Sequence, residues 1–193
     1  MKIWKLNNQN EFDRVNADPK INNWHDGPFR NSKDGLTEKK APPSIQEKAL
    51  GLDEVRDIQE CLILNSSGPN SFFNTDGYIW YHTGKAGKAP DFLGFHPEKG
   101  ISIVEVKWLA GWQKSLHDQV MRYVEQAKGS KSIPLEIWVI SAQGLSESVK
   151  KLLLDLPEKC KSNFGFHEVK IHLGQFFVGW DDDENFFIKL EWL

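Results

Sequence analysis

Residues 89–108 read APDFLGFHPEKGISIVEVKW, and their pattern is the most informative in the chain. Two apolar runs flank the turn HPEKG, and this pattern predicts two neighbouring antiparallel strands. An acid and a base, Glu105 and Lys107, stand inside the second run. Because side chains alternate along a strand, the two point to the same face. Burial of two ionised groups is costly unless they are paired, and the cost falls where that face opens into a cleft.

Asp91 opens the first of these two strands. Pairing of the strands would therefore bring Asp91 close to Glu105 and Lys107. Two carboxylates and the backbone carbonyl of Val106 are hard oxygen ligands of the kind that Mg²⁺ and Mn²⁺ prefer. Such a cation neutralises phosphate charge and lowers the pKa of a bound water, and a lysine stabilises the charge that builds on the phosphate. These are the groups that phosphodiester hydrolysis requires.

The segments around this hairpin predict a mixed sheet. A strand precedes it at 77–83, and apolar residues at helical spacing follow it at 113–128, before a buried strand at 135–141. A three-strand antiparallel meander followed by a helical crossover gives an α+β fold with helices flanking the sheet. The remaining expected elements are a short strand at 2–6, a helix at 44–64, a helix at 146–156, a strand at 167–173 and a hairpin at 176–193 that turns on Asp181–Asn185.

Pro90 and Asp91, thirteen residues, and then Glu105, Val106 and Lys107 resemble the PD-(D/E)XK nuclease motif. The core of that family is a helix, a three-strand meander, a helix and a further strand, which is the order predicted above. The resemblance covers roughly residues 44–140 and implies a restriction-endonuclease-like fold. It also implies that Asp91, Glu105 and Val106 bind Mg²⁺, with Mn²⁺ as a substitute, and that Lys107 is the catalytic lysine.

The resemblance extends into the helix after the motif. Gln119 and Tyr123 are similar to the QxxxY motif of the RecB-like branch, and they share a helix face because one turn separates them. They would support the site by contacting phosphate or by positioning Lys107. The family often carries an acid in its first helix. Glu54 and Glu60 are both candidates here, and the sequence does not choose between them.

Length and charge set the remaining expectations. The chain has 193 residues, a formal net charge of −3 and two cysteines, so a four-cysteine metal site is excluded. We expect residues 1–43 to be an N-terminal extension and residues 44–193 to be the nuclease-like domain, in a cytoplasmic protein without a membrane partner. Residues 84–131 carry a local excess of basic side chains, which is where a phosphate backbone would lie.

The sequence therefore predicts a Mg²⁺-dependent deoxyribonuclease, with endonuclease favoured over exonuclease and RNA as the alternative substrate. The resemblance implies a partner protein that supplies recognition or a motor, in a recombination, transposition or defence complex. Two alternatives stay open. One is a catalytically inactive nuclease-like module that binds nucleic acid or a protein, in which Glu105 and Lys107 form only an ion pair. The other is a nuclease toxin or effector.

Overall fold

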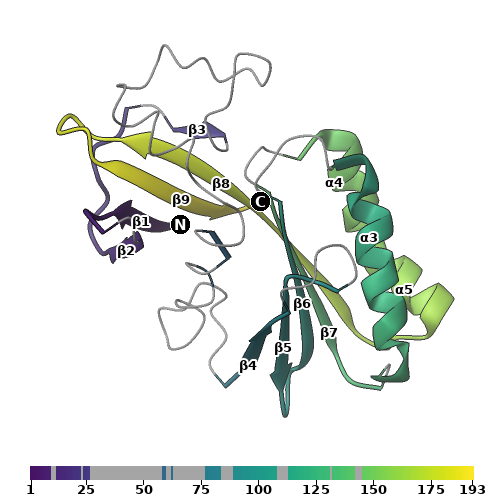
Figure 1. Cartoon of the computed structure of the whole chain (residues 1–193). Helices are drawn as coiled ribbons and strands as arrows, with labels where there is room; N and C mark the ends of the chain where they lie inside the picture. The colour runs from purple at the N-terminus through teal and green to yellow at the C-terminus, as the bar shows by residue number, and fades with distance from the viewer. Residues whose placement is uncertain are drawn as a thin grey trace.

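The structure, a computed structural model, describes residues 1–9, 12–22, 24–26, 58–59, 62, 77–83, 89–107, 113–130, 132–141 and 145–193. Its strands form one nine-stranded mixed sheet in the order β2-β1-β9-β8-β7-β6-β5-β4, with β3 paired to β8 (Figure 1). The strands are β1 (Lys2–Leu6), β2 (Phe12–Val15), β3 (His25–Asp26), β4 (Ile79–His82), β5 (Phe92–His96), β6 (Gly100–Lys107), β7 (Leu135–Ser141), β8 (Val169–Trp180) and β9 (Phe186–Trp192). The helices are α3 (Gln113–Gln126), the 3₁₀ helix η4 (Ala127–Ser130), α4 (Glu147–Leu154) and α5 (Leu156–Phe164).

The predicted meander is present. β4 pairs antiparallel with β5, and β5 pairs antiparallel with β6 in a register that sets Phe92 opposite Val104. α3 then crosses to β7, which pairs parallel with β6. Gly100 enters β6 with φ +93°, and a Cβ at this position would collide with the carbonyl oxygen of Pro134, so the turn into β6 requires glycine. The predicted mixed α+β class is confirmed, and the meander forms the β4 end of the sheet.

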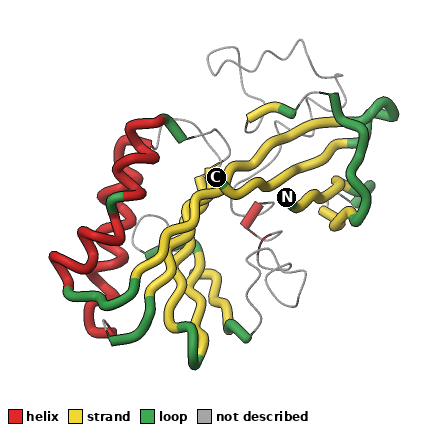
Figure 2. Tube along the Cα trace, turned by 180° about the vertical axis from the view of Figure 1, so that it is seen from behind, coloured by secondary structure: helices red, strands yellow, loops and turns green. Residues whose placement is uncertain are grey.

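Alternation along β6 supplies both faces of the sheet with apolar side chains. Ile101 and Ile103 pack toward α3, α4 and α5, while Val104 and Val106 belong to the core on the opposite face. Figure 2 shows the three helices together on one side of the sheet. On the other side, Ile58 and Leu62 of the predicted first helix pack into the core. β6 is therefore a fully buried central strand, and its charged residues lie within this packing.

β8 is longer than the sequence pattern predicted. We expected a strand at 167–173 and a separate strand from 176, but β8 runs unbroken through Gly174 and Gln175. Gly174 is buried opposite Trp192 of β9, and a Cβ at this position would collide with the Trp192 ring. The glycine therefore serves close packing within the sheet and does not mark a turn. The first half of β8 pairs with β7 and the second half with β9. The predicted turn at Asp181–Asn185 is confirmed.

The helix expected at 146–156 is shorter, and a second helix follows it. Ser146 caps α4, which ends at Leu154, and α5 begins at Leu156 with a proline in its first turn. Proline fits the first turn of a helix but interrupts the interior of one, which separates α4 from α5. α5 was not predicted, although Leu156 and Cys160 bury its inner face.

Three short strands lie within the range predicted as an extension. β1 pairs with β9, and Trp4 on β1 is 1% exposed in the same core as Phe92 and Val106. The predicted boundary between residues 43 and 44 lies outside the described residues. Within the described part of the chain, none of the helices combines the length and the apolar character that crossing a membrane would require.

Candidate active site

The two predicted acids lie on neighbouring strands. Glu105 on β6 faces the helix layer and is 1% exposed. Continuing the β5–β6 register by one residue sets Asp91 opposite Glu105. The Oδ2 atom of Asp91 accepts a 2.7 Å hydrogen bond from the backbone N–H of Val106. This side-chain bond continues the hydrogen bonding between β5 and β6 beyond the start of β5. This bond ties the Asp91 carboxylate to the strand that carries Glu105.

Lys107 and the two predicted supporting residues converge on Glu105. The Nζ atom of Lys107 forms an ion pair with Oε1 of Glu105. The side-chain amide of Gln119 donates to the same oxygen at 2.7 Å and to the hydroxyl of Tyr123 at 2.6 Å. Gln119 is 8% and Tyr123 2% exposed, so α3 presents both to the sheet rather than to solvent. One buried carboxylate oxygen is thus held by an ammonium and an amide.

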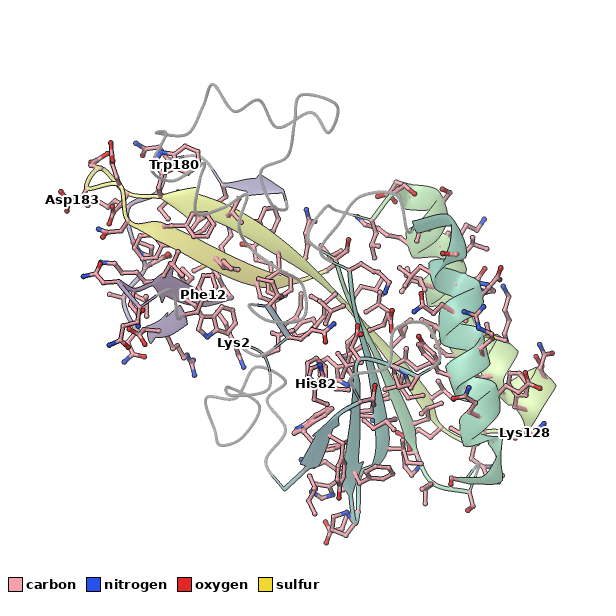
Figure 3. All side chains as sticks on the ribbon, in the orientation of Figure 1. Lys2, Phe12, His82, Lys128, Trp180 and Asp183 are labelled. Carbon is pink, nitrogen blue, oxygen red and sulfur yellow. The ribbon has the colours of Figure 1, made fainter. Side chains whose placement is uncertain are left out.

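Two further residues at the site were not predicted. Gln59 is 2% exposed, and its side chain hydrogen-bonds the Asp91 carboxylate. Oε1 of Gln59 also lies 2.6 Å from Nε2 of His82, a residue of β4 that is labelled in Figure 3. Because an amide oxygen only accepts, Nε2 of His82 donates and the Gln59 amide group faces Asp91. The sequence signal was a polar residue within the apolar stripe of the predicted first helix.

The first-helix acid is not settled by this geometry. Glu54 and Glu60 both lie outside the described residues. Gln59, next to one of them in the chain, is the described residue of that segment that reaches Asp91. The predicted contribution of an acid from this helix therefore stays a prediction.

Burial governs the electrostatics of the site. Burial raises the pKa of Asp91, although the Val106 N–H, the Lys107 charge and the Gln59 amide each act to lower that pKa. Burial also raises the pKa of the Tyr123 hydroxyl, so this group stays protonated and neutral. A raised carboxyl pKa means that the folded protein disfavours the negative charge on Asp91. A bound cation would relieve this, because it stabilises the ionised form.

The donor set fits a hard divalent cation. Asp91 and Glu105 supply carboxylate oxygens. The carbonyl of Val106 points to the same neighbouring strand as its N–H, and so toward Asp91. Across the described ranges, no group of three or more His, Cys, Asp or Glu side chains is gathered for a metal, so the predicted set relies on the backbone oxygen.

Few of the predicted basic residues can be placed around the site. Lys99 lies just before β6, at the opposite end of that strand from Glu105, and Lys128 is 3.7 Å from Glu125 in an exposed ion pair. The side chains that lie outside the described residues are those of Lys85, Lys88, Lys114 and Lys131. The expected phosphate-binding surface therefore stays a prediction.

Comparison of the chain with protein-family models, with curated proteins and with solved structures gave no match. The resemblance to PD-(D/E)XK nucleases accordingly depends on the motif residues and on the order of strands and helices around them.

Proposed function

We propose that the chain is a Mg²⁺-dependent nuclease that hydrolyses phosphodiester bonds of DNA, with endonucleolytic cleavage favoured. The observation that carries the proposal is the Glu105 carboxylate, which is 1% exposed and is held by both Lys107 and Gln119 beside Asp91. A buried charged cluster contributes little to stability compared with a well-packed apolar one, so a functional use accounts for it better.

A restriction-endonuclease-like core is part of the proposal. The meander β4–β5–β6, the crossover α3 and the parallel strand β7 support it, because the PD-(D/E)XK resemblance implies this order. The site lies where β5 begins and β6 ends. Side chains at strand ends can reach a ligand without disrupting the sheet, as catalytic residues commonly do.

Asp91, Glu105 and the carbonyl oxygen of Val106 would hold the cation, Mg²⁺ or its substitute Mn²⁺. When bound, it would neutralise phosphate charge and make the attacking water more acidic. Gln59 and the Val106 N–H fix the rotamer of Asp91, and Gln119 fixes that of Glu105. The protein thus prepares both carboxylates before a ligand arrives, which reduces the ordering cost of binding.

Lys107 is the group proposed to act on the substrate. In hydrolysis, a water oxygen forms a bond to phosphorus, the bond to the leaving oxygen breaks, and that oxygen takes up a proton. The ammonium group of Lys107, held beside Glu105, would orient the water and stabilise the negative charge that grows on the phosphate oxygens. Tyr123 anchors Gln119 and is proposed to act only through it.

A second candidate, a nuclease-like module that binds without cutting, is favoured by one observation. Lys107 already neutralises Glu105 within the protein, so the cluster is stable as an ion pair. Under either reading we propose DNA and a partner protein that supplies recognition or a motor as the molecular setting, in recombination, transposition or defence. This last step rests on the family resemblance.

The test is cleavage of linear and of circular DNA by the purified chain with Mg²⁺, with Mn²⁺ or with EDTA. We expect cutting that requires the metal and is lost in Asp91→Ala and Lys107→Ala, and cutting of the circle identifies an endonuclease. Lys161→Ala is the matched control, because Lys161 is an exposed lysine on α5 that pairs with Glu158 and lies outside the basic segment 84–131. Metal binding without cutting by the wild type would indicate that a partner is missing, and absence of both cutting and metal binding would favour the binding module.

A further inference from the structure

A pocket lies on the sheet face opposite α3, α4 and α5. It has a volume of about 590 Å³, which is within the usual range for small-ligand pockets. Glu136 and Trp138 of β7 face it, since they alternate with the residues that pack under the helices. The residues that line it include Tyr78, Glu136, Trp138, Lys170, His172 and Trp192.

The floor of this pocket is a rigid aromatic surface. Trp138 and His172, opposite each other on β7 and β8, stack with ring centroids 3.8 Å apart and 15° between planes. Trp192 on β9 meets Trp138 edge-on at 5.1 Å. Trp138 is 6% and Tyr78 8% exposed, whereas Trp192 is 37% exposed and stands at the rim. The pocket therefore offers preformed ring faces that can take a flat or cationic group.

The charges around this floor leave an excess of one carboxylate. Glu98, Glu136 and Glu168 line the pocket with two lysines, Lys99 and Lys170. Lys170 lies opposite Glu136 in the register of β7 and β8, but its ion pair is with Glu168, 2.9 Å away. Glu168 is the main reason that the pKa of Lys170 is raised, and Glu136 contributes less.

Glu136 is the carboxylate best placed to receive a cation. Its side chain is 18% exposed, and its nearest ring partner, His172, lies 3.9 Å away. Burial lowers the pKa of His172, so that ring is neutral near pH 7 and does not compensate the Glu136 charge.

We propose that this pocket binds an arginine side chain presented by a partner protein. A guanidinium group stacks on aromatic rings and bonds a carboxylate with two parallel hydrogen bonds, and the exposed ring of Trp192 and the carboxylate of Glu136 supply both kinds of contact. The negative excess disfavours a phosphate-bearing ligand. Since the pocket is larger than one side chain, residues next to the arginine in the partner also enter it.

The position of the pocket leaves the proposed active site accessible. Glu136 lies beside Ser102 in the register of β6 and β7, whereas Lys107 lies five residues further along β6 and pairs with Ser141. That separation is roughly 16 Å along the strand. Glu105 and Lys107 face the helix side of the sheet, whereas Glu136 and Trp138 face the opposite side. A partner docked through this arginine would therefore not cover Asp91 and Glu105, and the inference does not depend on nuclease activity.

The test is calorimetric titration of the full chain with N-acetylated, C-amidated tetra-arginine, alongside tetra-lysine and AMP. We expect tetra-arginine to bind at least several-fold more tightly than tetra-lysine and AMP to give no binding. Glu136→Gln should weaken tetra-arginine binding about tenfold or more. Glu158→Gln, which removes an exposed acid on α5, should leave it unchanged. Trp192→Leu gives a second, partly exposed probe of the pocket should Glu136→Gln fail to fold.

Three results would overturn the proposal. One is the absence of tetra-arginine binding to the wild type. Another is equal affinity of the wild type, Glu136→Gln and Trp192→Leu, which would place binding elsewhere on the acidic surface. The third is AMP binding that is lost in Trp192→Leu, which would make the pocket a nucleotide site.

Discussion

Replacement of Lys107 by methionine tests how the charged cluster is balanced. The side chain of Lys107 is 13% exposed and that of its partner Glu105 is 1% exposed. Removing one partner of a buried ion pair costs about 3–5 kcal/mol, because the other charge stays buried. Gln119 still donates to Glu105, so we expect Lys107→Met to destabilise the protein by about 3 kcal/mol.

Replacing Glu105 should lower the free energy of unfolding less than replacing Lys107 does. In Glu105→Gln the remaining charge belongs to Lys107, which lies nearer the surface and can extend into water, so the expected loss is about 1 kcal/mol. The double variant should therefore be more stable than Lys107→Met alone, because it no longer buries an uncompensated carboxylate. Mg²⁺ should restore about 1.4 kcal/mol to Lys107→Met when its free concentration is about ten times the dissociation constant.

Urea denaturation of the four proteins, with and without Mg²⁺, measures these differences as shifts of the midpoint at constant slope. Two outcomes would show that Glu105 is not a buried charge that depends on Lys107. One is an equal loss of unfolding free energy in the two single variants, and the other is a loss in the double variant that equals the sum of the two.

Three further predictions concern the support of the site. Tyr123→Phe should lower stability by about 1 kcal/mol in urea denaturation, because Gln119 loses its hydrogen-bonded anchor. Asp91 has a raised pKa, so the native state binds this proton more tightly than the unfolded state. As the pH rises from 3.8, the ordinary pKa of an aspartate side chain, to the raised pKa of Asp91, the free energy of unfolding of the wild type should fall relative to that of Asp91→Asn. Urea midpoints measured across this pH range give the difference. Trp4→Ala should cost about 3–5 kcal/mol by the same assay, since Trp4 is 1% exposed in the core behind β6.

The elements around the motif were predictable because each has its own hydrophobic pattern within a short stretch of sequence. β4 to β7 and α3 follow from alternation and helical periodicity, and the motif residues follow from their spacing along two strands. The shared face of Gln119 and Tyr123 followed from their spacing of one helical turn. The contact of Gln119 with Glu105 was not predicted, because phosphate or Lys107 was the expected partner.

What the sequence did not predict depends on tertiary context. Gln59 sits in an apolar stripe, and only the packing of its segment against the sheet brings it to Asp91 and His82. The continuity of β8 through Gly174 depends on the ring of Trp192 from another strand. The pairing of β1 with the last strand, β9, joins the two ends of the chain, which no local pattern reveals.

The most direct test of the central claim is calorimetric titration of the wild-type chain with Mn²⁺, repeated on Asp91→Asn and Glu105→Gln. We expect saturable Mn²⁺ binding in the wild type that is lost in both variants. Tyr123→Phe should keep this binding, because it leaves Asp91, Glu105 and Val106 unchanged. Absence of Mn²⁺ binding by the wild type, or unchanged binding in Asp91→Asn, would contradict the proposal that these two carboxylates hold a divalent cation.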